Sequence, residues 1–159
     1  MTKKLYLEDL RVGQRLRSKS VTITAQDIIR FARDNDPQYF HLDAEAAKDS
    51  MFGGLVASGW QTGALSIKLL IDSADPPFAR GLVGVEAHIA WKLPVRPGDS
   101  LRVEAEVTRI VHPRRHADRG FVSMNLETYN QRDEAVLTQR VTVVAFRDPA
   151  QVSAPENAG

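Results

Sequence analysis

The sequence predicts an α+β fold in which an antiparallel β-sheet wraps around one long central helix. Three observations support this prediction. Residues 59–71 are apolar or small on nearly every side of a helix. After residue 82 the hydrophobic period changes from 3.6 to 2, the change expected between a helix and half-buried strands. Short turn sequences join the alternating segments, as in antiparallel sheets.

The size and composition favour one globular domain. A chain of 159 residues can bury a substantial core without a second domain. We expect the domain to cover residues 1–148 and the polar tail, 149–159, to be disordered. With 21 Lys and Arg against 20 Asp and Glu, the charge balance predicts no nucleic-acid partner and no membrane partner.

Two features of the sequence bear on its environment. The chain has no cysteine, which excludes disulfides, thiolate metal ligands and cysteine nucleophiles and fits a reducing compartment. The amino terminus has no apolar run behind its lysines, and no segment approaches the roughly 20 apolar residues that span a bilayer. We therefore expect a soluble cytoplasmic protein.

The first half of the chain predicts short helices around an extended segment. Thr24 to Asp27 resembles a capping box and begins a helix with an apolar face. Pro37 disfavours the helical region for Asp36, so this helix should end near Asp34 and leave the Asp36 carboxylate on extended chain. A second short helix is expected over residues 44–50, with His41 between the two helices.

Helix 59–71 has Lys68 as its one charge, which predicts a buried helix rather than an amphipathic one. Residues 15–24 suggest a strand at one end of the domain, and four more strands are expected, over residues 83–93, 101–108, 121–129 and 136–146. The alternation slips at Arg109 and Ile110, which indicates a bulge. Residues 130–133 form a hairpin turn, and the last four strands are expected to form a meander.

Three motifs carry a resemblance to a known family. The segment DPQYFH places Asp36 and His41 five positions apart, FGGLVASGW leads into helix 59–71, and PVRPGD lies between two strands. In these motifs, and over about residues 8–147, the chain resembles the MaoC-like dehydratases, the hotdog-fold group that includes the (R)-specific enoyl-CoA hydratases. The usual family motif is Asp-x-Asn-Pro-x-His, so Gln38 and Tyr39 stand where Asn and Pro are expected.

The resemblance implies a hotdog fold and a function in acyl-CoA and fatty acid metabolism. The implied reaction is that of a lyase that reversibly hydrates trans-2-enoyl-CoA to (R)-3-hydroxyacyl-CoA. Asp36 and His41 would then hold the reacting water as a coupled acid–base pair whose individual roles stay open. The Gly59 backbone N–H would stabilise the thioester oxyanion, and Ser58 and Gln38 would support the pair.

Further residues are candidates for substrate contacts. Tyr39, Phe40 and Trp60 are candidates for the acyl pocket, although core packing would explain them equally well. The guanidinium groups of Arg114, Arg115 and Arg119 could bind CoA phosphates, or the loop that carries them could be a solvated hairpin. No cofactor is expected, because CoA is part of the substrate. Asp34, Asp36 and His41 are a poor metal-ligand set, and no metal is expected.

Two other functions fit the same fold. One is an acyl-CoA thioesterase, in which a carboxylate directs water to the thioester carbonyl. The other is a non-catalytic acyl-CoA-binding subunit. The sequence leaves open the length of the acyl group and whether CoA or an acyl carrier protein bears it. A sheet wrapped around one helix leaves an open edge, so a homodimer or higher homo-oligomer is expected, and the family forms such dimers.

Overall fold

The computed structural model describes residues 3–152, which form one sheet with a helix across it. In chain order the elements are η1 (Leu7–Asp9), β1 (Arg15–Arg17), β2 (Val21–Thr22), α1 (Ala25–Asn35), α2 (Tyr39–Leu42), η2 (Ala46–Asp49), α3 (Gly59–Asp72), β3 (Val83–Trp91), β4 (Ser100–Val111), β5 (Arg119–Tyr129), β6 (Ala135–Phe146) and α4 (Pro149–Val152). Here η denotes a 3-10 helix. The sheet is antiparallel, with the strand order β1-β4-β5-β6-β3, and β2 pairs with β4.

The predicted meander is correct for β4, β5 and β6 and wrong for β3. Instead of pairing with β4, which follows it in the chain, β3 pairs with β6 from Val83 opposite Val144 to Trp91 opposite Leu137. Residues 92–99 therefore run from β3, at one edge of the sheet, to β4, which lies next to β1 near the other edge. Alternating hydrophobicity indicates which face of a strand is buried, but it carries no information about the neighbouring strand.

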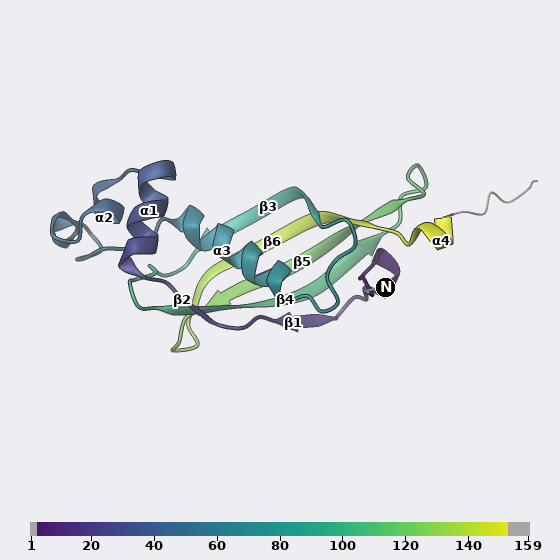
Figure 1. Ribbon diagram of the computed structural model, residues 1–159, viewed down its shortest axis with the longest axis horizontal. Helices are drawn as coiled ribbons and strands as arrows, with labels where there is room; N and C mark the ends of the chain where they lie inside the picture. Colours follow the sequence, from purple (N-terminus) through teal and green to yellow (C-terminus); the bar gives the residue numbers. More distant parts are fainter. Residues whose placement is uncertain (1–2, 153–159) are drawn as a thin grey trace, which may run out of the picture.

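The long helix α3 lies across one face of the sheet (Figure 1), which confirms the predicted α+β class and hotdog architecture. Leu69 and Leu70 on α3 join the main core cluster with buried side chains from three strands, among them Val103, Val122 and Val143. Burial of such side chains is the main favourable contribution to stability, typically about 1.5–3 kcal/mol for each large aliphatic residue. The position of α3, and so of its first residue, is set by this core.

The prediction of a helix buried on all sides is wrong within one chain. Trp60, Ile67 and Ile71 are 59%, 42% and 39% exposed, so α3 has an uncovered apolar stripe. Strand β3 is also more exposed than its alternation predicts, with Val85 57% exposed. Both follow from the position of β3 at the edge of the sheet, where β6 is its partner and one side of α3 has no covering element among the described residues.

The local predictions for the first half agree with the structure in most respects. Both bonds of the Thr24–Asp27 capping box form, and α1 ends at Asn35 with Asp36 as its C-cap residue. His41, however, lies within the one-turn helix α2 and not between helices. The predicted second helix is instead the 3-10 turn η2. Just before it, the Asp43 carboxylate accepts hydrogen bonds from the backbone N–H groups of Glu45 and Ala46.

The strand irregularities follow the sequence closely. The register of β4 against β5 shifts between Val107 and Arg109, next to the predicted slip, and the turn at residues 130–133 joins β5 to β6. The predicted strand at residues 15–24 is interrupted, because β1 ends at Arg17 and β2 begins at Val21. The tail predicted to be disordered begins with the short helix α4, and residues 153–159 lie outside the described part of the chain.

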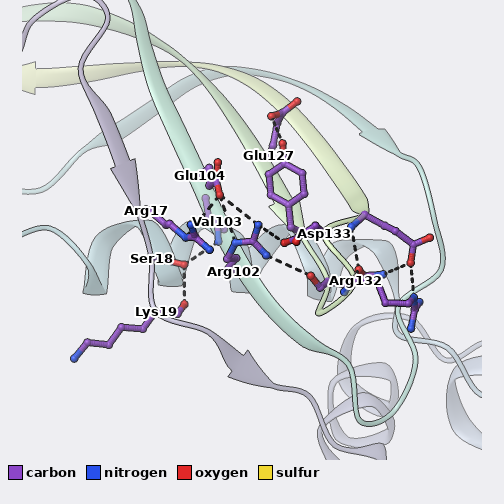
Figure 2. A network of polar contacts seen from close by, with 12 residues as sticks. Arg17, Ser18, Lys19, Arg102, Val103, Glu104, Glu127, Arg132 and Asp133 are labelled. Atoms are coloured by element: carbon purple, nitrogen blue, oxygen red, sulfur yellow. Dashed lines mark hydrogen bonds and ion pairs between the residues drawn. The ribbon is translucent and has the colours of Figure 1, made fainter.

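A polar network attaches the first strand and the last hairpin to β4 (Figure 2). The Ser18 hydroxyl accepts a hydrogen bond from the Val103 N–H at 2.8 Å, and the Ser18 N–H donates to the Val103 carbonyl at 2.8 Å. The mostly buried guanidinium of Arg102 pairs with Asp133 at 2.8 Å and with Glu104 at 3.4 Å. These contacts hold the end of the sheet opposite the β4–β5 loop.

The tightest backbone approach in the sheet generates a stability prediction. A Cβ atom at Gly120 would lie 2.6 Å from the Leu7 Cδ2 atom and 2.7 Å from the Val111 carbonyl oxygen. We expect Gly120→Ala to lower the free energy of unfolding in urea by about 1–3 kcal/mol, because Leu7 is buried and the backbone must shift. The control is Gly54→Ala, whose Cβ would make an ordinary 3.5 Å contact with Arg96. Equal effects of the two substitutions would contradict the prediction.

Candidate active site

Asp36 and His41 meet at the junction between α1 and α2. The Oδ2 atom of Asp36 lies 3.3 Å from the Nε2 atom of His41, and the two side chains are 17% and 6% exposed. Asp36 is the C-cap of α1 and His41 lies on α2. Pro37 ends the first helix, and the short bend between the helices turns the two side chains toward each other. The predicted pair therefore forms a direct contact in a largely buried position.

Three groups surround the Asp36 carboxylate and lower its pKa. Burial by itself would raise the pKa of Asp36, but the Ser58 hydroxyl donates to Oδ2 at 2.7 Å and the Gln38 amide donates to Oδ1 at 2.8 Å. Together with the charge of His41, these bonds hold the pKa of Asp36 below its ordinary value. Asp36 is thus an ionised carboxylate at neutral pH. Ser58 and Gln38 both contact it, as their predicted supporting role requires.

A backbone carbonyl fixes the orientation of the His41 ring. The Nδ1 atom lies 2.6 Å from the carbonyl oxygen of Val56. Because a carbonyl oxygen accepts hydrogen bonds and does not donate them, we assign the Nδ1 proton to this contact. The Nε2 atom then faces Asp36 and is the nitrogen that can exchange a proton with a bound molecule.

The N-terminus of α3 opens beside this pair. Gly59 is the first residue of the helix, where the backbone N–H has no acceptor within the helix. Ser58 caps the helix by accepting a hydrogen bond from the Trp60 N–H at 3.3 Å. A Cβ atom at Gly59 would lie 2.3 Å from Nε1 of Trp91, so the indole ring packs directly on the glycine. A larger residue would displace Trp91 or α3.

One cavity of about 490 Å³ contains the acid–base pair and the helix N-terminus. Its lining includes the predicted residues Asp36, Gln38, Phe40, His41, Gly59 and Trp60, and also Met51, Phe52, Trp91 and Lys92, which the sequence reasoning did not select. Met51 and Phe52 immediately precede the Gly-Gly break, and Trp91 and Lys92 lie shortly before the PVRPGD turn, with Leu93 between them and it. Proximity to these motifs was the available signal for all four.

Four of the residues predicted to contact the substrate do not line this cavity. Tyr39 is half exposed and packs on Phe40 with ring centroids 5.1 Å apart, but it does not line the cavity. Arg114, Arg115 and Arg119 lie on or next to the β4–β5 loop, at the opposite end of the sheet from α1 and α2 (Figure 1). Arg119 pairs with Asp118. Within one chain these arginines and the cavity are apart, and their contact with CoA stays a prediction.

The described residues form neither a cluster suited to a metal ion nor a membrane-spanning helix. Within residues 3–152, no three His, Cys, Asp or Glu side chains gather closely enough to hold a metal ion. No helix in the same range is long and apolar enough to cross a membrane. What the cavity offers is a carboxylate, an imidazole nitrogen and a free helical N–H around one apolar space, an arrangement suited to proton transfer and to oxyanion stabilisation.

Comparison with known proteins establishes the family. The family model described as the MaoC like domain matches residues 9–130, and the chain therefore belongs to the MaoC-like dehydratase family. Membership of this family supports the general conclusion that the protein is a hydratase or dehydratase enzyme. The MaoC-like dehydratase from Rhodospirillum rubrum shares 46% identity with this chain, with a TM-score of 0.86, and the alignment covers 91% of this chain and 99% of that one.

Two further relatives have more specific names. A 3-hydroxybutyryl-CoA dehydratase of Methylorubrum extorquens is 32% identical over 114 residues, which are 71% of this chain and 70% of that protein. The unliganded R-hydratase PhaJ1 from Pseudomonas aeruginosa has a TM-score of 0.69 at 26% identity, and the alignment covers 91% of this chain and 88% of that one.

The Ser58 hydrogen bond predicts a measurable change at Asp36. We expect Ser58→Ala to raise the pKa of Asp36 toward the ordinary value for aspartate. This pKa is measured from the NMR signal of the Asp36 carboxyl carbon during a pH titration. Near neutral pH the free energy of unfolding should fall by about 1.5–3 kcal/mol, the usual contribution of a hydrogen bond to a charged group. The lowered pKa stabilises the fold above the unfolded-state pKa, and this contribution is lost as the pH falls through the folded-state pKa.

The difference between Ser58→Ala and wild type should therefore shrink in acid. The exposed Ser20→Ala serves as the control and should change neither quantity. An unchanged Asp36 titration in Ser58→Ala would show that the hydroxyl does not stabilise the carboxylate.

Proposed function

We propose that this protein is a lyase that reversibly adds water to a trans-2-enoyl-CoA to give an (R)-3-hydroxyacyl-CoA. The observation that carries the proposal is the 3.3 Å contact between Asp36 and His41 inside a cavity that also contains the first N–H of α3. Hydration of an enoyl thioester needs a base for water, an acid for the α carbon and a donor for the thioester oxygen. The R-hydratase and 3-hydroxybutyryl-CoA dehydratase among its relatives support the same reaction.

The lowered pKa of Asp36 favours one assignment of the two roles. A carboxylate that stays ionised can accept a proton from water but has none to give, so Asp36 is the base and His41, protonated on Nε2, is the acid. As the water oxygen bonds to the β carbon, its proton moves to Asp36, and the Nε2 proton of His41 moves to the α carbon. Transfer of the proton from Asp36 to His41 across their contact restores the starting state. Dehydration follows the same steps in reverse.

Gly59 provides the third element of this mechanism. Negative charge develops on the thioester oxygen while the α carbon awaits its proton. A free N–H at the start of the 14-residue helix α3 offers a hydrogen bond and the positive end of the helix dipole. Trp91 packs against the glycine and closes one side of this position. The chemistry proposed for these groups requires no cofactor beyond the CoA of the substrate.

A second cavity is a candidate for the acyl chain. A groove of about 590 Å³ runs between α3 and β3, lined by apolar side chains that include Ile67, Ala87 and Ile89. Trp60 lines both this groove and the cavity that contains Asp36 and His41. The groove therefore begins where the reacting carbons would lie, and it is open along the exposed side of α3.

The same surface supports a homodimer. Strand β3 pairs with β6 on one side, and no described strand pairs with its other edge. Val83 and Val85 on this edge and Ile67 on α3 are between 42% and 57% exposed, and contiguous apolar exposure of this kind marks interaction sites. Pairing of β3 with β3 of a second copy would continue the sheet, bury these side chains and cover the groove.

The catalytic proposal is tested by following the ultraviolet absorbance of the conjugated enoyl thioester in crotonyl-CoA and a longer enoyl-CoA. We expect wild type to consume both substrates and Asp36→Asn or His41→Gln to be at least about 100-fold slower, since each removes one proton-transfer group. Asp34→Asn, an exposed carboxylate two positions away, should retain wild-type activity. Stereochemical analysis of the product should give the (R) alcohol.

Two companion assays, of thiol release and of acyl-CoA binding, distinguish this function from the two alternatives. Release of free thiol from saturated acyl-CoA, without loss of the enoyl absorbance, would favour a thioesterase. Binding of acyl-CoA without turnover, unaffected by Asp36→Asn, would favour a non-catalytic subunit.

The dimer is tested by light scattering. Wild type should have the mass of two chains, and Val85→Asp should shift it to one chain, because a charge on the free edge of β3 opposes strand pairing. The control is Val12→Asp, at a similarly exposed valine outside the strands, which should leave the mass unchanged. A monomeric wild type at working concentration would refute the dimer.

A further inference from the structure

On the sheet face beneath α3, one buried polar side chain has an unsatisfied amide nitrogen within the described part of the chain. Gln139 is 4% exposed, and its Nε2 atom has no hydrogen-bond partner among the residues that the structure describes. On either side, the register of β6 places it between Ile89 and Leu126. A primary amide between two aliphatic side chains is unfavourable unless something accepts its protons.

The neighbouring polar groups do not serve Gln139. The Ser66 hydroxyl contacts the Thr128 hydroxyl at 2.6 Å and the Thr62 carbonyl at 2.7 Å. These groups satisfy one another across the interface between α3 and β5. The unpaired amide of Gln139 is therefore not part of a general polar layer beneath the helix. A hydrogen-bond acceptor for it has to come from another group.

Gln139 lines the groove between α3 and β3. Alternate residues of β6, among them Gln139, Val141 and Val143, are buried, and the two valines pack in the core cluster with Leu70 of α3. The face of β6 that carries Gln139 is thus the face toward the helix and the groove. Most of the groove wall is apolar, and the other polar residues that line it are Glu86 and Thr142.

The register also gives the distance from the reaction site. Trp91 packs on Gly59 and stands opposite Leu137, and Ile89 stands opposite Gln139. Gln139 is therefore one pair along the same face from Trp91, which corresponds to two residues or roughly 7 Å along the strand. An acyl chain longer than crotonyl, with its thioester oxygen at Gly59, would reach the amide.

We propose that Gln139 selects acyl groups that carry an oxygen function, such as a hydroxyl or carbonyl, on the part of the chain that lies in the groove. The inference rests on the proposed function, because the thioester at Gly59 sets the position of the chain. The amide N–H groups donate to the substrate oxygen and remain unpaired when an unsubstituted alkyl chain occupies the groove. A site with a polar group left unpaired discriminates strongly against the analogue that lacks its partner.

Binding of saturated thioesters tests this inference without turnover. Hexanoyl-CoA and octanoyl-CoA are each compared by titration calorimetry with the counterpart that bears a hydroxyl group on its last carbon. For at least one pair, wild type should bind the hydroxylated compound about tenfold more tightly, as one satisfied buried hydrogen bond predicts. Gln139→Met, which keeps a similar volume without the amide, should abolish or reverse this ratio.

The matched control is Thr138→Val, because Thr138 precedes Gln139 on β6 and lies on the opposite face of the sheet. It should preserve the ratio. Equal binding of both members of each pair by wild type would overturn the inference, as would the same preference in Gln139→Met. Light scattering on Gln139→Met covers the remaining explanation. A loss of the dimer with no change in the ratio would show that the amide serves a partner subunit and would also overturn the proposal.

This outcome is separate from that of the hydration assay. If wild type hydrates crotonyl-CoA but shows no preference between the paired thioesters, the role of Gln139 fails and the lyase stands. If the preference is present and depends on Gln139 while no enoyl-CoA is hydrated, the selectivity stands and the reaction must be reassigned.

Discussion

The hydrogen bond from Ser58 to Asp36 is the interaction on which the site depends. Ser58 is fully buried immediately before α3, and its hydroxyl holds the Asp36 carboxylate at 2.7 Å while capping the helix. One side chain thus places the carboxylate relative to the N–H of Gly59. The carbonyl of Val56, two residues earlier, holds the ring of His41 in the same way. Both proton-transfer groups are positioned by the segment that leads into the helix.

This arrangement transfers the precision of the core to the site. Helix α3 is held on the sheet by Leu69 and Leu70 among closely packed aliphatic side chains, and closely packed interiors deform little. Asp36 and His41 themselves lie on a helix end and a one-turn helix, which have little rigidity of their own. Their hydrogen bonds to the segment before α3 supply it.

Local signals in the sequence predicted the elements and much of the cavity. The capping box at Thr24, the effect of Pro37 on Asp36, the start of α3 and the bulge in β4 are each encoded within a few residues. The contact of Trp91 with Gly59 and the position of the arginine loop at the far end of the sheet depend on which strands pair. The pairing of β3 with β6 joins residues about fifty positions apart, such as Trp91 and Leu137, and the hydrophobic period describes only the faces of each strand. For the same reason, the exposed stripe on α3 could not be predicted.

The pairing of β3 with β6 has a consequence for the order in which the protein can assemble. Among the described strands β6 is the last to be synthesised, and β3, made some fifty residues earlier, has no other partner in the sheet. During synthesis β3 therefore has no strand of its own chain to pair with until β4, β5 and β6 have emerged. Contacts between residues distant in sequence are also slow to form. The wall that carries Trp91 and Ile89 is completed only at that point. A nascent chain that already contains Asp36, His41 and α3 therefore still lacks a finished binding site until its final strand is in place.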